Sequence, residues 1–266
     1  SLIIIDSNNK DIQNLCFNLN ILLGSINNTI DVSKPVFLKK GRDSDFVDLL
    51  SDMSKGKIDG LIINEVNPFY NFHDQNKLKK SFEKVNFVTQ LTLKENETTD
   101  FVNYVLPKSH FLESWGDSNP INGMYTLRQP TINPIFDSIQ SEDFLLRTLG
   151  VQTKYKDYLS NFWKKSILNS NITWNQVLHD GFYFKNQDLF TNVKKNLDIS
   201  YTSKNIWSKY NEGNIELMLF FNHLGDGRMA NIPWLQELPD PINRTCWDNY
   251  LCVSKKLADK LELKNE

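Results

Sequence analysis

The fold of this chain is decided by residues 60–93, GLIINEVNPFYNFHDQNKLKKSFEKVNFVTQLTL. The apolar run Gly60–Asn64 suits one buried strand, and a second apolar run covers about 86–93. Between them, a polar helical pattern over about 74–84 turns Leu78 and Phe82 inward. This order predicts two parallel strands, because the helix returns the chain to the edge where the first strand began. Ligands of parallel sheets lie beyond the carboxyl ends of the strands, so loops 65–72 and 95–100 are predicted to share one edge and to hold the site.

The same alternation continues on both sides of this stretch. Towards the N-terminus, residues 2–6 and 35–38 are predicted as short strands, and helical patterns cover about 12–23 and 46–53. Towards the C-terminus, the apolar segment 101–106 ends at Pro107. Strands that alternate with helices at this pitch predict an α/β fold, doubly wound, with a mostly parallel sheet covered on both faces.

The rest of the chain is less regular. Residues 108–137 combine large apolar side chains with prolines and glycines, so we expect an irregular strap over the α/β core, anchored by Trp115. Ser141 is the expected N-cap of a helix that runs to residue 149. In the C-terminal part, 215–222 and 247–253 are predicted strands, and Ser254 is the expected cap of a last helix.

These patterns divide the chain into three parts. Residues 1–150 are predicted to form the α/β domain, 151–212 a helical insertion without strands, and 213–266 the truncated start of a C-terminal domain. The predicted apolar strands of that last part are expected to leave surface exposed, which should make the chain self-associate.

The composition excludes several classes of protein. The formal net charge of −2 provides no positive field that would collect phosphates, so nucleic acid is not an expected partner. The longest apolar run, residues 215–221, is much shorter than the roughly 18 residues of a membrane span. The 3 cysteines, Cys16, Cys246 and Cys252, cannot all pair and show no CxxC spacing. A disulfide scaffold and a four-cysteine metal site are therefore excluded.

Familiar catalytic motifs are missing from the sequence. The turn Asp6-Ser7-Asn8-Asn9 lacks the glycines of a dinucleotide-binding loop, and the chain has no Walker A sequence. The amides of that turn could hold an anion at a helix N-terminus, but simple helix capping is the favoured interpretation. No Gly-x-Ser-x-Gly elbow or catalytic-cysteine signature occurs. The residues alone therefore predict no catalytic set.

His110 and Glu113 are spaced so that both could bind a metal ion from one face of a helix. Two ligands do not make a zinc site, and His73, His179 and His223 are distant in the sequence. Local hydrogen bonding that orders the long segment around them is the favoured interpretation, so no metal ligand is predicted.

Several motifs carry a resemblance to a known family. The set GLIIN (60–64), Asn67-Pro68, Glu97-Thr98-Thr99, VLP (105–107) and ESWGD (113–117) resembles the molybdopterin oxidoreductase superfamily. The runs LESWGD (112–117), QPTINP (129–134) and Phe136-Asp137 resemble a narrower group, the molybdopterin-oxidoreductase-like iron–sulfur B subunit of alternative complex III, a quinol-oxidising respiratory complex. Matches to this group continue in Ser7-Asn8-Asn9, Ile12-Gln13, Leu22-Leu23-Gly24, NIPWLQELPDP (231–241) and WDNY (247–250). The similarity covers most of the chain and is weakest over 151–210.

The resemblance implies a set of residues in positions equivalent to a pterin pocket: Asn64, Asn67, Pro68, Glu97, Thr98, Thr99, His110 and Glu113. For the narrower group it implies a scaffold that holds no molybdenum cofactor in this segment and has no catalytic residue. The iron–sulfur clusters of that subunit type lie in a separate cysteine-rich part. Residues 100–103, DFVN, bring bulk where the family has a small residue and Asp, which argues against a pterin pocket.

Partners and location also follow from the resemblance. It implies other subunits of a membrane respiratory complex, including cytochrome c-type and integral membrane subunits. The chain would be peripheral at the periplasmic face of the bacterial inner membrane. The alternative is the cofactor-binding domain of an active redox enzyme, with loops 64–70 and 95–100 and the stretch 110–117 around molybdopterin guanine dinucleotide. A small-molecule-binding α/β module is the third and least specific interpretation.

Overall fold

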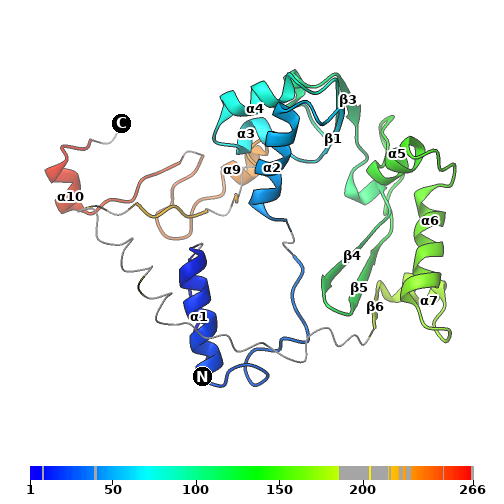
Figure 1. The fold of residues 1–266 in the computed structure, drawn as a ribbon, viewed down its shortest axis with the longest axis horizontal. Coiled ribbons are helices and arrows are strands. Elements are labelled where there is room, and N and C mark those ends of the chain that lie inside the picture. The colour runs from blue at the N-terminus through cyan, green and yellow to red at the C-terminus, as the bar shows by residue number, and fades with distance from the viewer. Residues whose placement is uncertain are drawn as a thin grey trace.

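The structure, a computed structural model, describes residues 1–7, 9–38, 41–185, 204, 215, 217–221, 224–225, 229–247 and 249–264. Its first sheet contains β1 (Gly60–Asn64), β2 (Phe87–Thr92) and β3 (Tyr104–Pro107) in the order β1-β2-β3. Figure 1 shows the three strands side by side. Both neighbouring pairs are parallel, with Leu61 opposite Val88 and Gln90 opposite Val105. The predicted α/β class with a parallel sheet is confirmed.

Two helices cover one face of this sheet. α2 (Asp43–Ser54) and α4 (Gln75–Phe82) place Leu50, Met53 and Leu78 in a cluster with Ile63 and Val88 of the strands. Complete burial of a side chain such as Leu50 contributes about 1.5–3 kcal/mol, so this cluster is the main source of stability here. Where a plain loop was predicted, α3 (Pro68–Asn71) forms a short helix, because proline at its first position is already fixed at a helical φ.

The two strands predicted nearest the N-terminus are not part of the sheet, and that expectation is wrong. Residues 2–5 instead run beside α1 (Lys10–Leu22), where Asn20 donates to the Ile3 carbonyl (2.8 Å) and accepts from the Ile3 amide (2.9 Å). Residues 35–37 lie against a hairpin through a bridge between Val36 and Ile121. Figure 1 shows α1 well away from the sheet. A doubly wound fold has helices on both faces of its sheet, and α1 does not cover the second face.

A second sheet replaces the irregular strap that was predicted over 108–137. It consists of β4 (Gly116–Ile121), β5 (Met124–Arg128) and β6 (Phe182–Phe184), all antiparallel. Asn122-Gly123 makes the tight turn, with Gly123 at φ +80°, a conformation that glycine adopts without strain. Pro120 sits where the β4–β5 register shifts, so it removes no regular ladder bond. β6 also contradicts the expectation of an insertion without strands.

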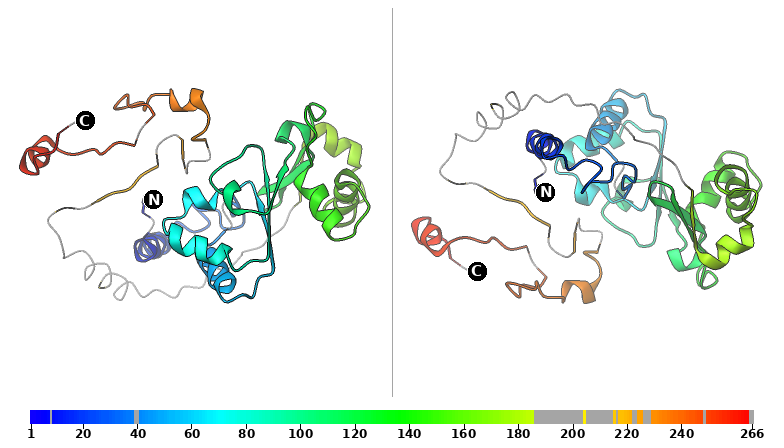
Figure 2. Two further views of the ribbon diagram at one scale, coloured as in Figure 1. Left: turned by 90° about the horizontal axis from the view of Figure 1, so that it is seen from above. Right: turned by 90° about the horizontal axis from the view of Figure 1, so that it is seen from below.

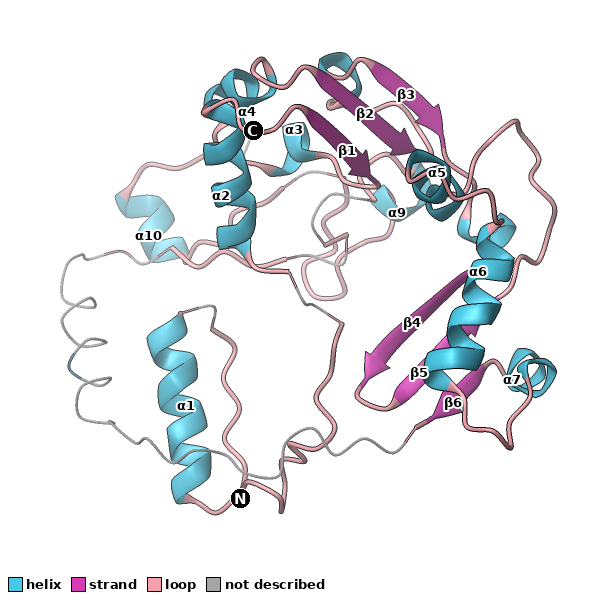
Figure 3. Ribbon diagram, turned by 45° about the vertical axis from the view of Figure 1, so that its right-hand side comes forward, coloured by secondary structure: helices cyan, strands magenta, loops and turns pink. Residues whose placement is uncertain are grey.

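Helices pack against this second sheet and enclose a core of their own. They are α5 (Ser141–Thr148), α6 (Tyr155–Phe162), the π-helix Trp163–Ile167 and α7 (Trp174–Asp180). Leu159, Trp163, Ile167 and Val177 are buried there. Figure 3 shows α6 and α7 beside β4–β6. Trp115 is half-buried against this cluster. The expectation that it anchors residues 108–137 on the α/β core is therefore wrong.

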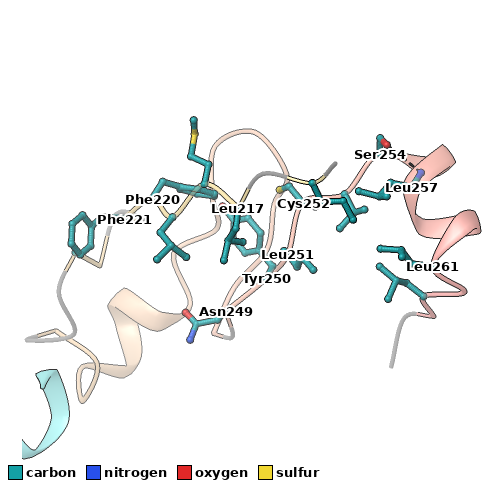
Figure 4. A pocket seen from close by; sticks show the side chains of 16 residues that line it. Leu217, Phe220, Phe221, Asn249, Tyr250, Leu251, Cys252, Ser254, Leu257 and Leu261 are labelled. Atoms are coloured by element: carbon teal, nitrogen blue, oxygen red, sulfur yellow. Dashed lines mark hydrogen bonds between the residues drawn. The ribbon is translucent and has the colours of Figure 1, made fainter. Parts of the chain in front are cut away.

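The C-terminal part is open. α9 (Pro233–Gln236) and α10 (Lys255–Lys260) are its described helices, and Ser254 caps α10 by accepting from Leu257 N–H, as predicted. In both views of Figure 2, α10 lies on the opposite side of the molecule from the hairpin. The described residues of 215–222 and 247–253 form no strand, and their apolar side chains surround an open hollow of about 730 Å³ (Figure 4). No described helix is long and apolar enough to span a membrane.

Candidate functional site

The candidate site lies at the carboxyl edge of the parallel sheet. The segments that follow β1, β2 and β3 meet there around a cavity of about 490 Å³. Its wall includes Glu65 and Asn67 after β1, Glu95 after β2 and His110 after β3, with Met229 and Ile232 contributed by the C-terminal part. Loops 65–72 and 95–100 therefore share one edge, which confirms the prediction.

Asn67 joins the two loops. Its Nδ2 donates to Glu97 Oε2 at 2.6 Å, and its Oδ1 accepts from the Thr98 hydroxyl at 2.6 Å. Thr98 is fully buried, and its Oγ1 also accepts from the Phe69 amide at 3.3 Å. Three residues taken from the family resemblance are thus brought together in one hydrogen-bond network.

A second hydrogen-bond network joins β2 to the loop that follows it. Gln90, fully buried in the middle of β2, donates to Asn96 Oδ1 (3.1 Å) and accepts from the Thr99 hydroxyl (3.3 Å). The Asn96 amide in turn donates to Thr99 Oγ1 at 2.9 Å. Thr99 therefore holds the loop after β2 rather than a ligand. Sequence analysis overlooked Gln90, although an amide inside an apolar strand is itself a signal, because a buried amide needs partners.

Asn64 and Pro68 are not in the wall of the cavity. Asn64 Oδ1 accepts from the Ser141 hydroxyl at 2.8 Å, which ties β1 to α5. Ser141 was predicted to be the N-cap of α5, and that prediction is wrong. Ser141 is the first residue of the helix, and the N-cap is Gln140, whose side chain makes no capping bond. Pro68 begins α3, and both residues border a separate apolar hollow of about 370 Å³ beside α2.

His110 and Glu113 order the chain locally. They form a capping box around the short 3-10 helix Phe111–Glu113, with Leu112 N–H donating to His110 Nδ1 and His110 N–H to Glu113 Oε2. Glu113 Oε1 also accepts from the Ile135 amide at 2.9 Å. The amides of Ile135 and His110 lower the pKa of Glu113 because they stabilise its charged form.

The favoured interpretation of His110 and Glu113 as a local hydrogen-bonding pair is confirmed. In the part of the chain that the structure describes, no group of three or more His, Cys, Asp or Glu side chains could hold a metal ion. His223 and Asn8 lie outside the described residues, so the predictions made for them have no structural counterpart.

Two charged residues at this edge were missed by sequence analysis. Glu65 follows β1 with φ +55°, and its Oε2 lies 2.6 Å from Lys108 Nζ at the end of β3. Charged residues next to strands are usually solvated, so the sequence holds no signal for this pair.

The residues at this edge do not fit a dinucleotide cofactor with its phosphates. Glu65 and Glu95 both line the cavity, and Lys94 is the one lysine or arginine among the described residues of its wall. Two carboxylates repel a phosphate at short range in a partly desolvated site. The Asn67 amide is already used within the chain.

Comparisons with known proteins give partial matches. No known protein-family model matches the chain. It is 28% identical over 82 residues to the assimilatory nitrate reductase catalytic subunit of Bacillus subtilis (strain 168), a match that covers 31% of this chain and 12% of that protein. Acetylene hydratase from Pelobacter acetylenicus aligns with a TM-score of 0.43 and 16% identity, over 55% of this chain and 21% of that one. The sequence similarity supports the resemblance at the level of the superfamily, and the chain spans only a small part of the relative's length.

Proposed function

We propose that this chain is part of a subunit of a quinol-oxidising respiratory complex of the alternative complex III type, in which it acts as a non-catalytic scaffold. The observation that carries the proposal is the closed network of Asn67, Glu97 and Thr98. Ligand sites keep a few polar groups aimed into the pocket. Here the Asn67 side chain, which lines the cavity, has both ends of its amide hydrogen-bonded to Glu97 and Thr98.

The proposed setting comes from the resemblance. The similarity to a nitrate reductase catalytic subunit supports a domain of the redox-enzyme class. The proposal adds iron–sulfur clusters elsewhere in the subunit, cytochrome c-type and integral membrane partners, and a peripheral position on the periplasmic face of the inner membrane. Large exposed apolar side chains in the C-terminal part, such as Leu217 and Phe221, suit burial against such partners.

A second candidate is the molybdopterin-binding domain of an active redox enzyme. The observation in its favour is the cavity of about 490 Å³, which lies where ligands of parallel sheets bind. Its size lies within the range of small-molecule pockets. The carboxylates of Glu65 and Glu95 in its wall favour the scaffold, because they would repel the phosphates of the cofactor.

Metal analysis of the purified full-length protein separates the two candidates. The scaffold predicts iron and acid-labile sulfide without molybdenum or tungsten. Stoichiometric molybdenum or tungsten would favour the second candidate and overturn the first.

A further inference from the structure

Glu65 has an unusual backbone conformation for its residue type. Its φ of +55° lies in the left-handed region, which is unfavourable for a residue with a Cβ and suits glycine. The backbone is fixed at this point, because the Glu65 amide donates to the Leu91 carbonyl of β2 at 3.1 Å. The side chain is half-exposed and forms part of the cavity wall.

The partner of Glu65 is a secluded lysine. The Lys108 side chain is only 12% exposed, and its Nζ lies 2.6 Å from Glu65 Oε2. The Lys108 amide donates to the Thr92 carbonyl at 3.0 Å, so the residue is anchored to β2. Lys108 contributes nothing to the cavity wall, whereas Glu65 does. Lys108 is therefore paired with a carboxylate whose residue belongs to the cavity wall.

We infer that Glu65 is a specificity-determining residue, which closes this cavity to phosphate-bearing ligands by neutralising Lys108 from within the chain. The inference rests on the proposed function, in which this edge carries no cofactor, and names the side chain responsible. A phosphate would meet Lys108 only by displacing a carboxylate already bonded to it. It would then also face the negative charges of Glu65 and Glu95.

Removal of the Glu65 side chain should open the site. Glu65→Gly deletes the carboxylate and suits the positive φ, so we expect the variant to fold. Glu65→Gln is the second variant, because it retains the size of the side chain and removes the charge. The probe is inorganic pyrophosphate, titrated calorimetrically into the full-length protein. Glu65→Gly should bind it about tenfold more tightly than the unaltered protein, the change expected from one charge-assisted contact.

Three further variants assign the effect to Lys108. Glu65→Gly combined with Lys108→Ala should return pyrophosphate binding to the unaltered level. Glu95→Ala removes the same charge from the same wall without releasing Lys108, and should gain less than about threefold, well under a full charge-assisted contact. Asp52→Ala breaks the exposed pair of Asp52 with Lys57 (2.9 Å), which takes no part in the cavity wall, and should leave binding unchanged.

Two results would overturn the inference: no gain for either Glu65 variant, or an equal gain for Glu95→Ala. Failure here remains distinct from failure of the proposed function. The proposed function fails if the unaltered full-length protein contains molybdenum or tungsten, whereas the inference is measured by pyrophosphate affinity of variants.

Discussion

At the scale of single residues, the carboxyl edge of the sheet depends most on Asn67. Both ends of its amide are used, and the Thr98 hydroxyl that donates to it is fully buried. Asn67→Ala should lower the free energy of unfolding by about 1–2 kcal/mol, because a buried hydroxyl loses its acceptor. Asn71→Ala is the matched control, since Asn71 lines the same cavity, is exposed, and has no side-chain hydrogen bond to any described residue. Equal denaturation midpoints for the two variants would contradict the network.

Glu113 predicts a pH dependence of stability. The Ile135 and His110 amides lower its pKa in the folded chain below the value of about 4.3 expected in the unfolded chain. The contribution to stability is therefore complete above the unfolded pKa and is lost as the pH falls through the folded pKa. Glu113→Gln should melt below the unaltered protein at about pH 7, and the gap should narrow at about pH 3.

A matched control and a contrary outcome define this pH test. Glu83 is exposed and has no side-chain hydrogen bond to any described residue, so Glu83→Gln should show no such gap. A gap for Glu113→Gln that stays constant with pH would show that its carboxylate charge does not hold the loop.

At the scale of elements, the π-helix ties the hairpin to the helices that cover it. Trp163 is fully buried, and its Nε1–H donates to Asp117 Oδ2 of β4 at 2.8 Å. Burial, together with the nearby charge of Asp117, raises the pKa of Tyr155 above its usual range, so Asp117 faces Tyr155 as well as Trp163. Trp163→Ala should cost about 3–5 kcal/mol and lower the melting temperature by several degrees.

Trp234 provides the control for this substitution, because its side chain is 81% exposed. Trp234→Ala should leave the melting temperature unchanged. A similar loss for both variants, measured by thermal unfolding followed by tryptophan fluorescence, would contradict the role of the second core.

Some elements could be predicted from the sequence and others could not, for physical reasons. β1 and β2 were predicted closely because each is an apolar run bounded by polar residues, so local pattern and burial agree. Residues 2–5 carry the same apolar pattern, but whether a strand joins a sheet depends on a distant partner. The β4–β5 hairpin is signalled by Asn122-Gly123, but the nearby prolines disfavour a regular strand unless one of them falls at a register shift, as Pro120 does. The shared edge of loops 65–72 and 95–100 could be predicted from the order of strands and helices. Gln90 is an amide inside an apolar strand and so leaves a signal in the sequence, whereas the Glu65–Lys108 pair arises only from three-dimensional packing.

At the scale of the whole molecule, the described C-terminal segments expose a large apolar surface. Leu217, Leu219 and Phe221 are each more than two-thirds exposed. Contiguous apolar surface of this kind drives association. The chain should therefore self-associate as its concentration rises, and Leu219→Glu should reduce this in sedimentation or light-scattering experiments.

Leu149 allows a matched comparison, because it is similarly exposed but follows α5 in another part of the chain. Leu149→Glu should leave the association unchanged. A chain that stays monomeric at high concentration, or an equal effect of the two substitutions, would show that the C-terminal surface is not the cause.

We propose that the carboxyl edge of the parallel sheet holds no pterin, because Asn67 is bonded to Glu97 and Thr98 and Glu65 is paired with Lys108. The most direct test is to denature the purified full-length protein, oxidise the extract and measure the fluorescence of any released pterin against protein concentration. The closed network of Asn67, Glu97 and Thr98, together with Glu65 across Lys108, predicts no pterin above background. Pterin released in a stoichiometric amount would contradict the claim.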